Sequence, residues 1–290
     1  MRPARTSDGP HPGPAPALRD DPVALRSPAM CRFFAGVMRR QVRHGFRALR
    51  VLGDGLPDTG DAPLVIYSNH PSWWDPALFM VLHDALMGSR QGFGPMEAAA
   101  LDRYRFMKRI GIFGVDPGTR AGAARFLRVG AHVLSDPGRV MWMTAQGRFA
   151  DPRERPVDLR PGLAHLMARV PGARAVPMAV EYPFWSEKRP EALVAFGAPV
   201  SAGAEGTAEA WQAALAAALT DAQDRLADAA IARDPSAFTP VLSGGRGVGG
   251  VYGAWSRLRA WAQGRPHDPD HMSDRAPRLM APGAPMSRSR

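Results

Sequence analysis

The chain has 290 residues, 45% of them hydrophobic and 22% charged, which is an ordinary globular composition and enough length to bury one large core. Its single cysteine, Cys31, excludes an intramolecular disulfide and a cysteine-based metal site. The net charge of +10 comes almost entirely from arginine and suits phosphate-bearing partners such as an anionic bilayer, a nucleic acid or a coenzyme thioester, although a general bias toward arginine explains it equally well.

Residues 1–28 come first and are rich in proline, glycine and arginine. Such a segment cannot bury enough apolar surface to fold, so we expect a disordered leader. It lacks the apolar core of a signal peptide. No stretch of the chain has the uninterrupted apolar length of a membrane-spanning helix, so any contact with a membrane is expected from one side only.

Residues 29–52 show the spacing of an amphipathic helix, because their apolar residues recur every three or four positions. Several arginines stand between them, and no acidic residue follows before Asp54. A basic helix of this kind can lie in the membrane interface with its arginines on anionic headgroups, which is the contact that we expect. The alternative is an ordinary amphipathic helix packed on its own domain.

Residues 53–240 alternate short apolar runs with helical segments, a pattern typical of an α/β domain. The predicted strands are residues 64–68, 110–115, 140–145, 175–181 and 192–196. The predicted helices are residues 76–87, 119–135, 161–169 and 207–232. The fold class is therefore predicted as α/β, with a layered mixed sheet flanked by helices and an N-terminal amphipathic helix.

Residues 241–264 predict a glycine-rich loop followed by a short amphipathic helix at 251–262, and residues 265–290 predict a disordered tail. The glycines at 245–250 have the Gly-x-Gly-x-x-Gly spacing of a dinucleotide site, but no strand leads into them, as such a site requires. We interpret them as a flexible loop. The helix at 251–262 carries tryptophans and arginines and is a second candidate for membrane contact.

The candidate catalytic site is the sequence Asn-His-Pro-Ser-Trp-Trp-Asp at residues 69–75, directly after the predicted strand 64–68. A histidine followed five positions later by an aspartate arises by chance in roughly half of the chains with this composition, so the spacing alone has little weight. Two prolines flank the polar cluster and predict a turn, which can bring His70 and Asp75 together although a regular helix would not. Asp75 would then orient the imidazole, and His70 would accept the proton of an attacking hydroxyl. The alternative is a structural His–Asp hydrogen bond at the start of a helix.

Residues 69–75 resemble the first motif of the glycerolipid acyltransferase family, which includes the 1-acylglycerol-3-phosphate acyltransferases. Three further segments resemble the later motifs of that family in the same order, within residues 63–182: Gly-Ile-Phe-Gly-Val-Asp at 111–116, Thr-Ala-Gln-Gly-Arg at 144–148 and Ala-Val-Pro-Met-Ala-Val at 175–180. The resemblance implies an α/β acyltransferase in which His70 is the catalytic base and Asp75 its partner.

The second and third segments depart from the pattern of the family. Pro117 stands where an arginine commonly follows the acidic residue, and Arg120 is the candidate to replace that arginine. Gln146 stands in place of the usual glutamate and is followed by Gly147 and Arg148. The planar guanidinium of Arg148 makes it the expected ligand for a phosphate or a similar oxyanion. Gln146, Gly147 and Arg120 are the other candidates for substrate binding. These departures leave acyl transfer supported but weaken the inference that the acceptor is lysophosphatidic acid.

The sequence thus predicts transfer of a fatty acyl group from acyl-CoA or acyl carrier protein to a hydroxyl of a lysophospholipid or related membrane lipid, with no metal and no bound cofactor. We expect a peripheral protein on the cytoplasmic side of the cell membrane, in contact with its anionic surface. Acceptors without phosphate, namely a glycolipid, an ornithine-type lipid or a hydroxylated isoprenoid, are alternatives. From other classes, the degraded motifs fit a catalytically silent membrane-binding protein, and the charge alone fits a nucleic-acid-binding protein. We expect no nucleic acid, because the aromatic residues are not interleaved with arginine on strands.

Overall fold

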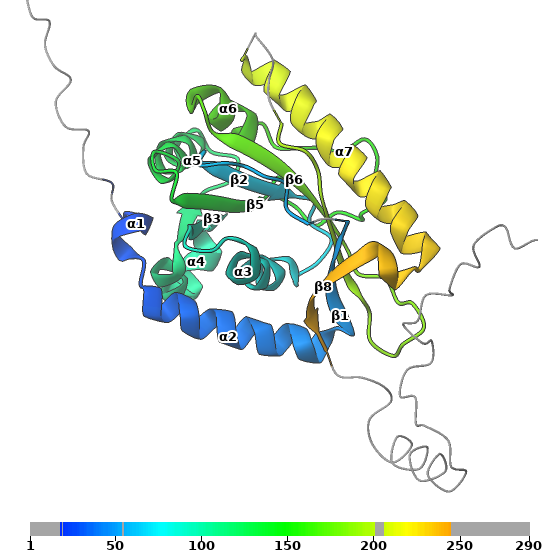
Figure 1. The fold of residues 1–290 in the computed structure, drawn as a ribbon. Helices are drawn as coiled ribbons and strands as arrows, with labels where there is room; N and C mark the ends of the chain where they lie inside the picture. The colour runs from blue at the N-terminus through cyan, green and yellow to red at the C-terminus, as the bar shows by residue number, and fades with distance from the viewer. Residues whose placement is uncertain (1–17, 19, 54, 201–205, 245–290) are drawn as a thin grey trace, which may run out of the picture.

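A computed structural model of the chain describes residue 18 and residues 20–53, 55–200 and 206–244. Within these residues eight strands form one mixed sheet in the order β4-β3-β5-β2-β6-β7-β1-β8 (Figure 1). The strands are β1 (Ala48–Leu52), β2 (Leu64–Ser68), β3 (Gln91–Glu97), β4 (Ile112–Val115), β5 (Arg139–Thr144), β6 (Arg174–Glu181), β7 (Ala192–Phe196) and β8 (Phe238–Ser243). The predicted α/β fold class is confirmed.

Five neighbouring strands of the sheet run parallel, namely β4, β3, β5, β2 and β6. β7 is antiparallel to β6, β1 is parallel to β7, and β8 is antiparallel to β1. Because parallel strands end at the same edge of a sheet, the segments that follow β2, β5 and β6 meet there. β2 lies between the other two, so the residues directly after it lie at the centre of this edge.

Helices cover both faces of the sheet. They are α1 (Pro22–Leu25), α2 (Pro28–Gly45), α3 (Asp75–Leu86), α4 (Ala98–Arg103), α5 (Arg120–Val133), α6 (Gly162–Arg169) and α7 (Ala208–Ala232), with 3-10 helices η1 (Arg105–Ile110) and η2 (Pro235–Ala237). Leu64 and Ile66 of β2 point to the core under α2 and α3, whereas Val65 and Tyr67 point to the core under α5, α6 and α7. Burial on both faces explains why β2 is an unbroken apolar run.

The N-terminal helix is shorter than the sequence predicts. The prediction covers residues 29–52, but α2 ends at Gly45 and residues 48–52 form β1. β1 is paired on both sides, with β7 and β8, and this pairing outweighs the helical spacing of a short apolar run. Arg50 is buried in β1, where its Nε donates to Oε2 of Glu191 at 3.0 Å, so this end of the predicted helix cannot contact a membrane.

Three other segments differ from expectation. Pro22–Leu25 in the predicted leader forms α1, because Asp21 caps it by accepting from the N–H of Val23 at 2.8 Å. Residues 241–243, predicted as the start of a loop, belong to β8, which pairs with β1. β3 is absent from the prediction, since its glycines and proline have little strand propensity. The predicted helix at 251–262, the tail at 265–290 and most of the leader lie outside the described residues.

Candidate active site

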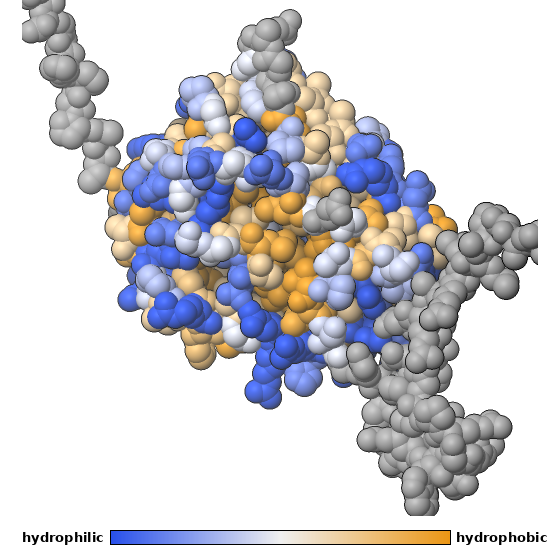
Figure 2. Space-filling view, viewed as in Figure 1, coloured by the Kyte–Doolittle hydropathy of each residue, from blue (hydrophilic) through white to orange (hydrophobic). Residues whose placement is uncertain are grey.

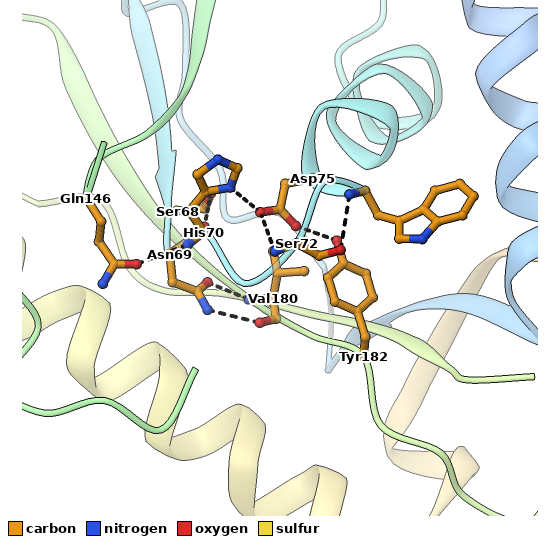
Figure 3. Close-up of polar contacts among 9 residues, drawn as sticks. Ser68, Asn69, His70, Ser72, Asp75, Gln146, Val180 and Tyr182 are labelled. Atoms are coloured by element: carbon orange, nitrogen blue, oxygen red, sulfur yellow. Dashed lines mark hydrogen bonds and ion pairs between the residues drawn. The ribbon is translucent and has the colours of Figure 1, made fainter. Parts of the chain in front are cut away.

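His70 and Asp75 are brought together by a turn between β2 and α3. The N–H of Asp75 donates to the carbonyl of Ser72 at 3.2 Å, and α3 begins at Asp75. This turn places the Nδ1 of His70 2.5 Å from the Oδ2 of Asp75 (Figure 3). The pair therefore has the geometry that five residues of regular helix would not allow.

The two side chains differ in their access to solvent. Asp75 is fully buried, whereas the side chain of His70 is 17% exposed. Nδ1 is occupied by Asp75, and Nε2 has no hydrogen-bond partner in the described part of the chain. The exposed ring of Phe149 lies against the imidazole, with centroids 4.3 Å apart. The site thus offers one accessible imidazole nitrogen whose opposite nitrogen is held by a buried carboxylate, which is the arrangement of a general base.

Tyr182 is a third member of this group that the sequence analysis missed. Its hydroxyl donates to the Oδ1 of Asp75 at 2.5 Å, while the Oδ2 also receives the N–H of Ser72 at 3.3 Å (Figure 3). Burial, with a smaller effect of Asp75, raises the pKa of Tyr182 well above its ordinary value, so the hydroxyl stays protonated. Tyr182 directly follows β6, and only the pairing of β6 with β2 brings it to Asp75. The position of Tyr182 just after the fourth motif was the one signal in the sequence that could have identified it.

Asn69 and Gln146 hold the backbone that carries the histidine. The side chain of Asn69 donates to the carbonyl of Val180 at 3.0 Å and accepts from its N–H at 2.9 Å. The Oε1 of Gln146 accepts from the backbone N–H of His70 at 3.0 Å (Figure 3). The N–H of Ala150 donates to the carbonyl of His70 at 3.0 Å. Gln146 is buried, so the structure gives its side-chain oxygen a positioning contact.

Arg148 of the third segment and Arg160, which lies outside it, have different surroundings in the structure. Arg148 is exposed and donates two hydrogen bonds to the carboxylate of Glu154, and this pairing raises the pKa of Arg148 and lowers that of Glu154. Arg160, which the sequence analysis missed, lies over Gly147: a Cβ built on this glycine would be 2.4 Å from the Nε of Arg160. Gly147 also has φ +63°, a value that favours glycine. The guanidinium of Arg160 has no partner in the described part of the chain.

Arg120 and the two tryptophans of the first segment do not bond to the His70–Asp75 pair. Arg120 begins α5 after β4, which is three strand positions from β2 and therefore about 14 Å away at the spacing of neighbouring strands. It does not join the residues that contact His70. Trp74 packs edge-on against Phe46 with centroids 5.0 Å apart, whereas Trp73 is 75% exposed beside the site.

The described residues contain no group of three or more histidine, cysteine, aspartate or glutamate side chains placed to hold a metal ion. None of their helices is long and apolar enough to cross a membrane. Hydrophobic residues reach the surface around α3, the helix that begins at Asp75, and hydrophilic residues surround them (Figure 2).

The fold and the site define an α/β protein with a His–Asp pair at the carboxyl ends of its parallel strands. A similar fold is found in the crystal structure of the 1-acyl-sn-glycerophosphate (LPA) acyltransferase PlsC from Thermotoga maritima. The match has a TM-score of 0.50 and 10% sequence identity, and it covers 68% of this chain and 79% of that one. Models of protein families and a search of curated proteins give no match. The likeness shows a shared fold.

Proposed function

We propose that the protein is an O-acyltransferase that moves a fatty acyl group from a thioester to a hydroxyl of a membrane lipid. The observation that carries the proposal is the contact between His70 and the buried Asp75, with the Nε2 of His70 left accessible at the centre of the sheet edge. The fold shared with an acyltransferase supports the reaction class. The apolar surface around α3 is suited to a fatty acyl chain.

The reaction needs no nucleophile from the protein. The Nε2 of His70 takes the proton of the acceptor hydroxyl as the oxygen attacks the thioester carbonyl. Asp75 stabilises the imidazolium that forms and holds the tautomer with the proton on Nδ1. When the tetrahedral intermediate collapses, the carbon–sulfur bond breaks and the imidazolium returns its proton to the leaving thiolate. Tyr182 holds the carboxylate in place throughout.

The proposed donors are acyl-CoA and acyl carrier protein, and the proposed acceptor is a lysophospholipid or a related lipid. We assign binding of the acceptor phosphate to Arg160. The exposed guanidinium of Arg160 is unpaired in the described part of the chain, and this side chain lies on Gly147, next to the Gln146 that contacts the backbone of His70. Arg148 can add to this site once it leaves Glu154. Arg120 is better placed for a distant part of a long substrate. The protein would work peripherally on the cytoplasmic side of the membrane, where thioester donors are present.

The test is release of free thiol from a long-chain acyl-CoA by the full chain, with lysophosphatidic acid, a larger lysophospholipid and a neutral glycolipid as acceptors. His70→Ala should lower the rate by about 100-fold or more. His165→Ala, at an exposed histidine of α6, is the matched control and should leave the rate unchanged. Transfer to none of the acceptors, or unchanged transfer by a folded His70→Ala variant, would contradict the proposal and favour a silent lipid-binding protein.

The assignment of Arg160 has its own test. Arg160→Gln should raise KM for acceptors that carry phosphate by about tenfold, with little change for a neutral glycolipid, because one charge-assisted contact is lost. Arg153→Gln, which breaks the exposed pair with Asp151, is the control. An equal change of KM for charged and neutral acceptors would show that Arg160 does not bind the headgroup anion.

A further inference from the structure

Four aromatic rings form a continuous cluster on the surface, which we call the aromatic cluster: Phe33 and Phe34 of α2, Tyr104 between α4 and η1, and Phe106 of η1. Phe34 of α2 stacks on Phe106 of η1 with centroids 4.8 Å apart and nearly parallel planes. Phe33 meets Phe34 edge-on at 5.3 Å, and Tyr104 meets Phe106 at 6.4 Å. The stacked pair therefore joins α2 to η1, the segment before β4, although Phe34 and Phe106 are 72 residues apart in the sequence.

The outer rings of the aromatic cluster are open to solvent. Phe33 is 62% exposed, Tyr104 48% and Phe106 39%. Ser27, which caps α2, donates its N–H to the carbonyl of Arg109 in η1 at 2.8 Å. α1 also lies against η1, and its Leu25 is exposed. Single exposed apolar residues are common, but a contiguous group of aromatic rings marks a surface that meets a partner or a membrane.

Basic residues surround the aromatic cluster. Residues 26–45 and 98–110 together carry nine arginines and lysines and one acidic residue, Asp102. Arg39 is paired with Asp84, and Lys108 with Asp20. The arginines that are exposed and have no ion-pair partner in the described part of the chain include Arg32, Arg103, Arg105 and Arg109. Hydrophilic and hydrophobic residues accordingly lie side by side along the lower edge of Figure 2, where Figure 1 shows α2.

We propose that this composite surface, α2 together with residues 103–110, binds an anionic bilayer, with the aromatic cluster in the headgroup layer and the arginines on lipid phosphates. This membrane contact rests on the proposed function, because a membrane lipid is the acceptor proposed above. Phenylalanine and tyrosine suit the interface, and long arginine side chains reach phosphates beside buried rings. A nucleic acid fits less well, because the rings of Phe34 and Phe106 stack on each other, so the faces in contact are not available for stacking with bases.

The opposite end of α2 connects this surface to the candidate active site. A Cβ built on Gly45 would be 2.8 Å from the ring of Trp74, so the helix end packs directly against the residue before Asp75. From Phe33 to Gly45 the helix advances about 18 Å, at 1.5 Å per residue. α2 therefore reaches from the membrane-contacting cluster to the turn that holds the catalytic pair. The sequence prediction placed the contact on residues 29–52, whereas the structure removes residues 46–52 from it and adds residues 103–110.

The test is flotation of the full chain with vesicles of phosphatidylcholine, with or without about 30% phosphatidylglycerol. Phe33→Ala should weaken binding to the anionic vesicles by about tenfold, because the variant lacks a largely exposed ring that would bury apolar surface in the membrane interface. The double variant Arg103→Gln/Arg105→Gln should weaken it by about 25-fold, at about fivefold for each arginine, and more so at low salt.

Matched controls lie under the opposite face of the sheet. Ile231→Ala removes a side chain of α7 that is even more exposed than Phe33, and Arg169→Gln/Arg174→Gln removes two exposed arginines from α6 and the start of β6. Both should bind like the wild type. Equal binding by all variants, absence of wild-type binding to anionic vesicles, or tighter binding to a single-stranded oligonucleotide would each overturn the proposal. The assay contains no acyl donor, and His70→Ala should bind vesicles normally, so its result is separate from that of the acyl-transfer assay.

Discussion

Replacement of Tyr182 by phenylalanine tests whether the buried carboxylate acts through the imidazole. The change removes one hydroxyl and keeps the ring, which packs near Phe46 with centroids 5.3 Å apart. It deletes the 2.5 Å hydrogen bond to the Oδ1 of Asp75, a fully buried side chain. A hydrogen bond to a charged acceptor contributes about 1.5–3 kcal/mol, so this is the upper limit for the loss in free energy of unfolding.

The effect on catalysis has a definite sign. A carboxylate with one donor fewer is a stronger acceptor for the imidazolium, so the protonated form of His70 becomes more favourable. Because His70 must be neutral to accept a proton, the acid limb of the kcat/KM profile should move to higher pH. Part of the free energy of the lost hydrogen bond reappears as a stronger interaction between Asp75 and the imidazolium. Each 1.4 kcal/mol gained in this way moves the acid limb by about one pH unit.

The measurement is kcat/KM for acyl transfer across the acid limb, together with urea unfolding of the same samples. Tyr67→Phe is the control, because it removes a buried hydroxyl that donates to the carbonyl of Leu215 at 2.9 Å and does not contact Asp75, and it should keep the wild-type profile. A Tyr182→Phe variant that is less stable but retains the wild-type pH profile would refute the coupling and leave Tyr182 with a purely structural role.

Three further changes test the surroundings of the site. Gln146→Glu keeps an acceptor for the His70 N–H and should stay within about 1 kcal/mol of the wild type in urea unfolding, whereas Gln146→Ala should cost about 1–3 kcal/mol; equal losses would contradict the positioning contact. Gly147→Ala should destabilise the chain by at least about 1 kcal/mol more than Gly118→Ala, since both glycines have positive φ but only Gly147 would place a Cβ against Arg160. Burial, with a smaller effect of Arg26, lowers the pKa of His83 to about 4 from 6.5. The unfolded chain therefore binds a proton first, and unfolding free energy should fall by up to about 3 kcal/mol as the pH drops from 6.5 to 4. His83→Gln keeps an acceptor for the indole of Trp142 and should remove this dependence, and a Gln variant with unchanged pH dependence would assign it to other groups.

The local pattern of the chain was enough to predict that His70 and Asp75 meet, and to predict the elements beside them. The unbroken apolar run at 64–68 identifies a strand buried on both faces, and the prolines after it predict the turn that joins His70 to Asp75. These inferences succeed because a strand, a turn and a helix start are decided largely by residues next to each other in sequence.

Only the tertiary structure decided which distant residues complete the site and which surface is exposed. Tyr182 is 107 residues from Asp75, and its contact depends on the pairing of β6 with β2, which no local period encodes. Residues 48–52 have helical spacing but form β1, because hydrogen bonding to strands on both sides is stronger than the preference of five residues. The sequence by itself thus determined the contact between His70 and Asp75 and the α/β class, while long-range pairing decided the second partner of Asp75, the exposed arginine next to Gly147 and the end of α2 at Gly45.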